Sequence, residues 1–274
     1  MKKNFTKALI LCILLNCSAS TPTIISKPNL FGRWLVYYIN NINEVSRGLN
    51  KINERKGMYR QIVDEYVKKF DEAGIKCSKE SLLDLLMAHE YVESRGNLKC
   101  ISFAGACGPR QFMPETARYY GLKNDSYINE SINPEKSTRA ALDFILDCVK
   151  KYHSLELALL SYNTGTKKIE KILEKYPDIK NAFEIPEDLL KKESINYIPK
   201  IESLLLLLED QKKYGININS KELKFIKHKT NKNEILSEIA KKYNSNEDLI
   251  MEYNGIKDKS RIPIDYVLII PIEP

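Results

Sequence analysis

The sequence has few histidines, glycines and prolines and no long apolar run, and each shortage excludes a class of protein. Three His in 274 residues leave little room for a multi-histidine metal site. Eleven Gly and eleven Pro exclude collagen-like and proline-rich chains, and six Cys are too few for a dense disulfide scaffold. No stretch beyond the N-terminus approaches the roughly 20 apolar residues of a membrane-spanning helix. A hydrophobic content of 43% is enough for an ordinary core, so we expect one large domain or two modest ones.

The positive charge is weak once the N-terminus is set aside. The net charge is +7, but Lys2, Lys3 and Lys7 supply three of these charges, which leaves +4 for residues 21–274. That charge is spread over a surface rich in both Lys and Glu, so we predict no nucleic-acid partner.

The first 20 residues resemble an export signal. A basic start precedes an eight-residue apolar run, Ala8 to Leu15, which is too short to span a bilayer. Small residues favour cleavage after Ser20, giving domain boundaries of 1–20 for the signal peptide and 21–57 for an N-terminal segment. Alternatively, the run ending at Cys17 resembles a lipoprotein box in which this Cys is lipidated, although Asn16 departs from that pattern. We expect an exported protein of the periplasm, either free or anchored to a membrane.

The cysteines of the exported chain leave two alternatives open. An exported location permits disulfides, and four Cys allow three complete pairings that sequence cannot distinguish. Cys100 and Cys107 are close enough in sequence for a local bridge. The other reading is free, buried thiols. The four residues are Cys77, Cys100, Cys107 and Cys148.

Helical periodicity dominates from residue 58 to residue 214. A continuous apolar stripe runs from Tyr59 to Phe70, and Gly74 ends that helix. Ser78 is a plausible N-cap for the next helix, which carries five apolar residues between Leu82 and Met87. Further helices are predicted near 115–120, 135–152, 155–162, 166–175 and 194–209. This body is therefore mainly α.

The pattern changes after a predicted linker at 215–222. Residues 225–227 and 267–270 are strand candidates, and two short helices near 235–243 and 248–253 lie between them. Residues 223–272 thus form a βααβ module. Its ten basic and nine acidic residues from 221 to 274 nearly cancel.

One carboxylate stands on the apolar side of the helix that begins near Leu82. At 100° per residue, Glu93 returns to within roughly 20° of Leu82, so its carboxyl loses hydration and its pKa is expected to rise. A raised pKa suits a general acid. A Glu at a helix end can also simply reach water. His89 and Glu90 share part of that face, so helical position alone leaves the choice open.

Four short motifs resolve the choice by resemblance. In order and spacing, they resemble the motifs of the soluble lytic transglycosylase family. The four motifs are Glu93-Ser94, Ser102, the run Gly105 to Pro114, and Ala158 to Gly165. Ser102 lies nine residues after Glu93 and Gln111 eighteen, at the family's spacing. The resemblance selects Glu93 over Glu90.

Further segments resemble one branch of that family. Two segments are similar to the membrane-bound lytic transglycosylase D branch, whose members carry C-terminal LysM repeats. They are Pro134 with residues 137–141, and residues 197–200. Residues 223–272 resemble one LysM module. The resemblance implies a lysozyme-like helical catalytic domain over 58–214. Two positions depart from the pattern: Arg110 replaces a Met or aromatic residue, which implies a different cleft wall, and residues 231–233 replace the usual LysM opening.

The resemblance implies cleavage of the β-1,4 bond between N-acetylmuramic acid and N-acetylglucosamine, with formation of a 1,6-anhydro ring and no metal or organic cofactor. Glu93 would act as acid and then as base. The expected partner is the glycan strand of peptidoglycan. Two alternatives remain: a muramidase that hydrolyses the same bond, and a wall-binding protein without activity. The implied substrate-binding residues are Ser102, Gln111, Met113, Tyr162 and Asn163.

Overall fold

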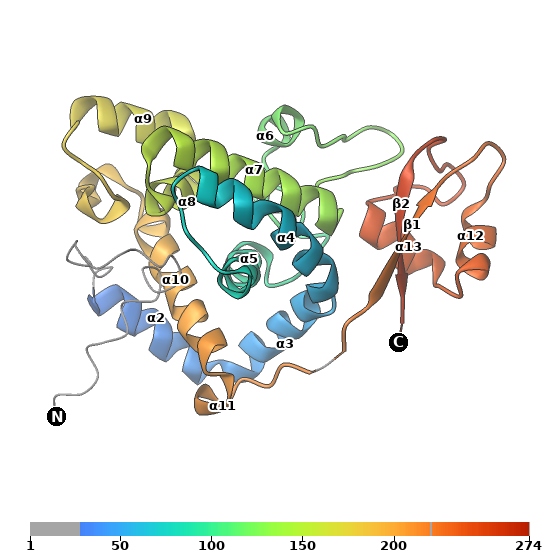
Figure 1. Ribbon diagram of the computed structural model, residues 1–274, viewed down its shortest axis with the longest axis horizontal. Coiled ribbons are helices and arrows are strands. Elements are labelled where there is room, and N and C mark those ends of the chain that lie inside the picture. Colours follow the sequence, from blue (N-terminus) through green and yellow to red (C-terminus); the bar gives the residue numbers. More distant parts are fainter. Residues whose placement is uncertain (1–27, 220, 274) are drawn as a thin grey trace. The chain divides into compact units, whose positions relative to one another are not determined.

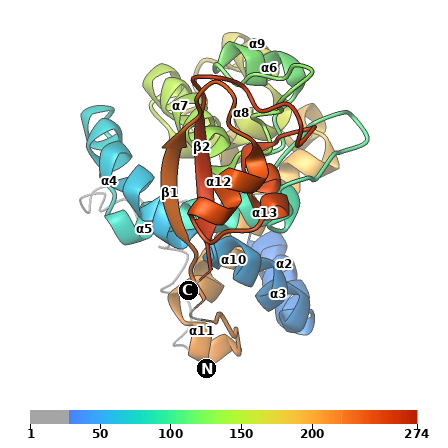
Figure 2. The ribbon, with the colours of Figure 1, turned by 90° about the vertical axis from the view of Figure 1, so that its right-hand side faces the viewer.

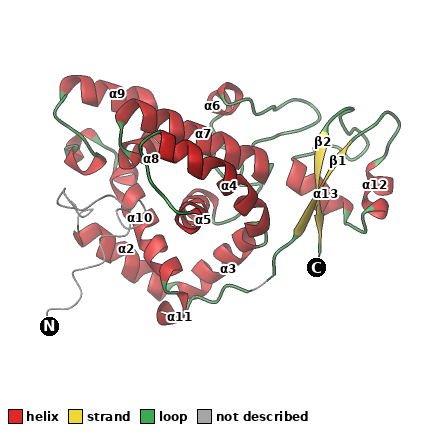
Figure 3. Cartoon of the chain, viewed as in Figure 1, coloured by secondary structure: helices red, strands yellow, loops and turns green. Residues whose placement is uncertain are grey.

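The computed structural model describes residues 28–219 and 221–273, so the predicted signal peptide and Cys17 lie outside the described residues. The chain is mainly helical and ends in a small βααβ module, as predicted (Figure 1). Strands β1 (Lys224–Lys229) and β2 (Val267–Ile272) belong to that module (Figure 3). The helices of the described chain, in order, are α2 (Pro28–Asn40), α3 (Ile42–Asn53), α4 (Lys56–Glu72), α5 (Lys79–Ser94), α6 (Pro114–Tyr119), α7 (Pro134–Tyr152), α8 (Leu155–Thr164), α9 (Thr166–Lys175), α10 (Lys192–Glu209), α11 (Gln211–Tyr214), α12 (Leu236–Lys242) and α13 (Glu247–Asn254). Two 3₁₀ turns, η1 (Ala182–Glu184) and η2 (Glu187–Leu189), precede α10, and the strands are β1 (Lys224–Lys229) and β2 (Val267–Ile272).

The described chain forms two compact units. The first comprises residues up to 46, 63–92 and 142–217, and the second comprises residues 47–62, 93–141 and 218 onward. The loops of residues 95–133 and the C-terminal module thus belong to the same unit. None of the helices in the described ranges is both long and apolar enough to cross a membrane.

Local signals explain the first two predicted helices. The apolar stripe of α4 is buried apart from the partly exposed Val67. The backbone N–H of Ser81 donates to the Ser78 hydroxyl at 3.0 Å, so Ser78 starts α5 as expected. Every residue from Leu85 to Tyr91 is buried. This part of α5 is therefore buried on all sides, whereas the periodicity had indicated only one apolar face.

Two helices of the N-terminal segment had no counterpart in the sequence prediction. Helix α2 packs along α10, where the Trp34 indole donates to the Asn196 side chain at 2.8 Å and the Lys200 amine lies 4.6 Å from the Trp34 ring centre (Figure 1). In α3, Val45 and Leu49 are spaced four residues apart and are buried. That spacing was a usable helix signal.

The C-terminal module is a two-stranded antiparallel sheet with two helices (Figure 2). Strand β1 pairs with β2 so that Ile226 faces Ile270. Asn246 caps α13 by accepting from two backbone N–H groups, and Asn254 at its end donates to the Ile269 carbonyl at 2.7 Å. The buried Asn254 side chain therefore attaches α13 to β2.

Candidate active site

Glu93 lies in the last turn of α5, where the chain leaves the helix. Arg95 and Gly96 follow with φ of 53° and 76°, which is incompatible with a continuing α-helix. A Cβ on Gly96 would lie 2.8 Å from the Gly48 carbonyl oxygen, so only glycine lets this turn approach α3 so closely. The Glu93 side chain is partly exposed, while Glu90, one turn earlier, has 0% exposure. Of the two carboxylates that competed in the sequence, Glu93 is the one that solvent reaches.

Gln111 holds together the loop that follows α5. Its amide nitrogen donates to the carbonyl oxygens of Cys100 at 3.0 Å and Gly108 at 2.8 Å, which uses both amide hydrogens. Gln111 itself has φ of 50°, a conformation uncommon for a non-glycine residue and often found at functional sites. Only the amide oxygen of Gln111 is left to accept a further hydrogen bond.

The same loop lies within electrostatic reach of Glu93. Burial raises the pKa of the Cys100 thiol, and the negative charge of Glu93 raises that pKa further. Glu93 therefore lies near Cys100, which belongs to the loop that also contains Ser102 and Gln111.

Ser102 is engaged in a tight turn of this loop. Its hydroxyl oxygen accepts the Ala106 N–H at 2.9 Å, and its carbonyl accepts the Gly105 N–H at 2.9 Å. The hydroxyl hydrogen of Ser102 is not needed for either bond. The turn points Phe103 into solvent, and Ile101 is also exposed.

Three exposed apolar side chains belong to the loop that follows α5 or to its end: Ile101, Phe103 and Met113. Met113, predicted to line a sugar subsite, is 43% exposed and precedes α6. Sequence reasoning missed Ile101 and Phe103. The available signal was that these are the two large apolar residues within residues 99–111.

Tyr162 and Asn163 lie on α8 in the other unit. The Tyr162 ring meets the His89 ring edge-on with centroids 4.6 Å apart and the Phe144 ring at 4.9 Å. The Asn163 side-chain oxygen accepts the Ser194 hydroxyl at 2.8 Å, which connects α8 to α10. The Asn163 side chain therefore links two helices, and its part in substrate binding stays a prediction.

Arg110 does not form a cleft wall, contrary to the sequence-based expectation. Its side chain has 0% exposure, its Nε donates to the Thr138 hydroxyl at 3.1 Å, and its guanidinium lies 5.4 Å from the Tyr59 ring centre. The alternation of residues in a loop does not reveal which way a side chain points. Here the Tyr59 ring and the Thr138 hydroxyl are among the groups that surround the buried guanidinium.

Arg110→Ala is expected to lower the free energy of unfolding by about 3 kcal/mol because it leaves a cavity beside Tyr59. Arg110→Met fills most of that volume, so we expect it to cost less than Arg110→Ala. Urea unfolding of both variants measures the difference. Equal stability of Arg110→Ala and the wild type would contradict the interior role.

The four described cysteines are free, which favours the free-thiol alternative, although only Cys148 is fully buried and the other three are partly exposed. Burial raises the pKa of Cys148 to about 12 and that of Cys77 to about 11, so both thiols stay protonated at neutral pH. Cys107 accepts a hydrogen bond from the Asn129 amide at 3.3 Å.

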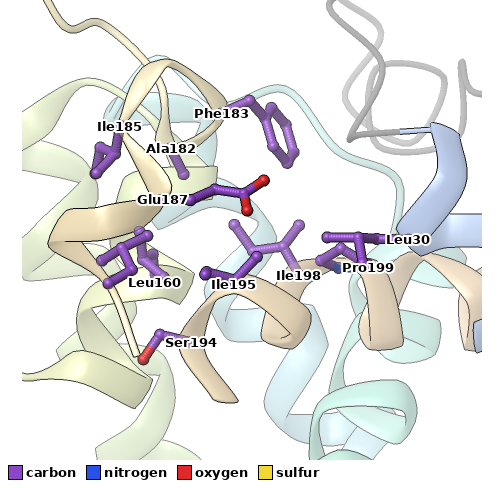
Figure 4. A pocket seen from close by; sticks show the side chains of 11 residues that line it. Leu30, Leu160, Ala182, Phe183, Ile185, Glu187, Ser194, Ile195, Ile198 and Pro199 are labelled. Carbon is purple, nitrogen blue, oxygen red and sulfur yellow. The ribbon is translucent and has the colours of Figure 1, made fainter. Parts of the chain in front are cut away.

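A small pocket in the first unit is lined mainly by apolar side chains (Figure 4). Its cavity volume is about 30 Å³, and Glu187 and Ser194 are among the residues that line it. None of the predicted site residues belongs to its lining. This volume suits a water molecule better than a sugar.

Two family models match the chain. Residues 73–183 match the transglycosylase SLT domain, and residues 228–271 match the LysM domain. The first match contains Glu93 and every other predicted site residue of the helical body, and the second coincides with the βααβ module. The predicted resemblance to both families is confirmed.

The chain is also similar to curated relatives and, over part of its length, to solved structures. The chain is 28% identical over 128 residues to membrane-bound lytic murein transglycosylase D of Escherichia coli strains K12 and CFT073, which is 46% of this chain and 28% of each relative. The chain therefore spans well under half the length of these relatives. Among solved structures, an inactive variant of lytic transglycosylase Slt from Pseudomonas aeruginosa has 20% identity over 55% of this chain and 24% of its own, with a TM-score of 0.39. The 70 kDa soluble lytic transglycosylase of Escherichia coli has 16% identity over 74% of this chain and 33% of its own, also with a TM-score of 0.39.

Proposed function

We propose that this chain, which carries an SLT domain followed by a LysM domain, is a peptidoglycan lytic transglycosylase. The observation that carries the proposal is the placement of a partly exposed Glu93 at the end of α5, beside the loop that Gln111 clamps. That arrangement supplies one accessible carboxyl group near a loop held by hydrogen bonds, within the segment that matches the SLT domain.

The proposed reaction needs one carboxyl group. Protonated Glu93 donates its proton to the glycosidic oxygen as the bond from that oxygen to C1 of N-acetylmuramic acid breaks. The Glu93 carboxylate then accepts the proton of the sugar's own 6-hydroxyl, whose oxygen forms a bond to C1. The products are a free 4-hydroxyl on N-acetylglucosamine and a 1,6-anhydro ring, and no water is consumed. Typical glycosidases instead use two carboxylates that flank the bond.

The remaining site residues are assigned supporting roles. The Ser102 hydroxyl hydrogen and the Gln111 amide oxygen are available for a sugar hydroxyl or N-acetyl group, since their other hydrogen-bonding groups hold the loop. The exposed Met113 would contact an apolar sugar face. Tyr162 and Asn163 are assigned to substrate binding by the motif they share with the family.

The cellular setting is part of the same proposal. We infer that the chain is exported to the cell envelope, that Cys17 or the residues after Ser20 begin the mature protein, and that the LysM domain binds glycan. The domain boundaries proposed are those of the sequence analysis.

Digestion of purified peptidoglycan tests the function. The mature protein is expected to release muropeptides with 1,6-anhydro ends, each one water lighter than the hydrolysed product, and mass spectrometry measures this difference. Reducing ends alone would identify a muramidase. A protein that sediments with the wall but releases nothing would be a binding protein only.

A further inference from the structure

The LysM domain shares backbone hydrogen bonds with the SLT domain within the second unit. The Asn129 N–H donates to the Gly255 carbonyl at 2.8 Å, and the Lys257 N–H donates to the Tyr127 carbonyl at 2.9 Å. Between them Ile128 and Ile256 form an antiparallel bridge. A module on a flexible tether has no such paired backbone.

Gly255 makes this close approach possible. A Cβ at this position would lie 2.0 Å from the Asn129 carbonyl oxygen, and the φ of 63° also favours glycine. The end of α13 is therefore shaped to fit the SLT-domain loop.

An apolar residue of the SLT domain completes the LysM core. Ile128 has 2% exposure and is buried in a cluster whose other members belong to the LysM domain. Those members are Leu236, Ile239, Ala240, Ile250, Ile256, Tyr266, Leu268 and Ile270. Removing Ile128 from this cluster would expose apolar surface on both sides of the contact.

A buried polar network crosses the same contact. The Tyr266 hydroxyl donates to Glu130 at 2.8 Å, and the Lys136 amine pairs with Glu130 and lies 3.0 Å from the Tyr266 oxygen. Glu130 has 3% exposure, and its other oxygen accepts the Lys123 N–H at 2.8 Å. Because burial and the Glu130 charge both raise the pKa of Tyr266, its hydroxyl remains a donor. A charge this deeply buried is costly unless all its partners are in place.

Two residues of the predicted linker, and the first residue after it, are also held by hydrogen bonds or an ion pair. The Asn219 N–H donates to the Asn50 side chain at 2.7 Å, and the Leu223 N–H donates to the Glu54 carbonyl at 2.8 Å. Residue Glu222 forms an ion pair with Arg60 at 2.7 Å. These bonds fasten the residues before β1 to α3 and α4.

We propose that residues 93–141 and the LysM domain form one rigid body, so that a glycan strand bound by the LysM domain meets the loop of residues 100–113 in a fixed register. A flexible tether would only raise the local concentration of wall, whereas a rigid contact favours strands long enough to reach both surfaces. The rigid contact is inferred from the structure alone. The register of the glycan strand against this loop rests on the proposed function.

Nitrogen-15 relaxation of the mature full chain tests the rigid contact. Backbone amides of residues 93–141 and 223–272 are expected to report the same rotational correlation time. A clearly shorter time for residues 223–272 would overturn the proposal, because it would show a module that tumbles by itself.

Two variants test which residues hold the contact. Ile128→Ser is expected to shorten the correlation time of the LysM amides, while Ile264→Ser, at an apolar position of the LysM domain that is exposed, leaves it unchanged. Tyr266→Phe keeps the ring in the core and removes only the hydroxyl. It therefore still tests the contact if Ile128→Ser unfolds the LysM domain. Wild-type tumbling of both contact variants would overturn the assigned contact.

Activity on two substrates tests the register. The contact variants are expected to cleave intact peptidoglycan about tenfold more slowly than the wild type and to cleave a short soluble muroglycan at the wild-type rate. Equal rates, or equal losses on both substrates, would overturn the register. A wild-type protein that cleaves neither substrate would contradict the proposed function and leave the tumbling result unaffected.

Discussion

Glu93→Gln is expected to reduce the release of anhydro-muropeptides about 10³-fold, while the protein still folds and still sediments with the wall. An amide of the same size can neither donate the proton to the glycosidic oxygen nor accept one from the 6-hydroxyl, and each role of a general acid or base contributes about 10²–10⁴-fold. Timed digestion of purified peptidoglycan with mass-spectrometric quantification measures the rate. Circular dichroism checks the fold.

Glu90→Gln is the matched control, because Glu90 lies one turn earlier on the same helix. Its side chain is fully buried, so we expect this change to alter stability more than the cleavage rate. Full activity of Glu93→Gln together with an inactive but folded Glu90→Gln would assign the catalytic role to Glu90 instead.

Gly108→Ala is expected to lower the free energy of unfolding by roughly 3–5 kcal/mol and to abolish cleavage with it. Gly108 has φ of 86°, and a Cβ there would lie 1.8 Å from the Ser131 carbonyl oxygen. That oxygen is backbone and cannot rotate away. The loop would have to shift. The Gly108 carbonyl, which accepts a hydrogen bond from the Gln111 side-chain amide, would move with it.

Gly105→Ala separates the clash from the backbone strain. Gly105 has φ of 87°, nearly the same as Gly108, but a Cβ there would meet nothing within 4 Å. We expect a loss of about 1–2 kcal/mol from strain alone. Chemical denaturation of the two variants measures the difference, and equal losses would show that the approach of Gly108 to Ser131 is not a constraint.

The helices that the sequence predicted correctly carry their signals locally. Each signal depends on residues within about one or two helical turns. These signals are the apolar stripe from Tyr59 to Phe70, the N-cap Ser78, and Gly74, which ends a helix. The order and spacing of the motifs around Glu93 and Gln111 are also properties of the chain. The SLT and LysM matches confirm what these local patterns indicated.

The environments of individual side chains depend on distant segments and needed the tertiary structure. Arg110 is buried because Tyr59 and Thr138, far from it in sequence, provide its surroundings. Residues 85–91 of α5 are all buried, and rings of α2, α8 and α10 contact His89 and Tyr91, so a single apolar face underestimated the burial of this helix.

The attachment of the LysM domain shows the same division most clearly. Its βααβ pattern was readable from residues 223–272, because strands and short helices follow periods of two and 3.6 residues. The contact with Ile128 and Glu130 joins segments more than 100 residues apart, and neither residue stands out in its own neighbourhood. The sequence by itself therefore determined the kinds of element and the motif that carries the chemistry. Only the tertiary structure decided which side chains are buried and which domains share a core, because burial and pairing are set by residues that periodicity does not connect.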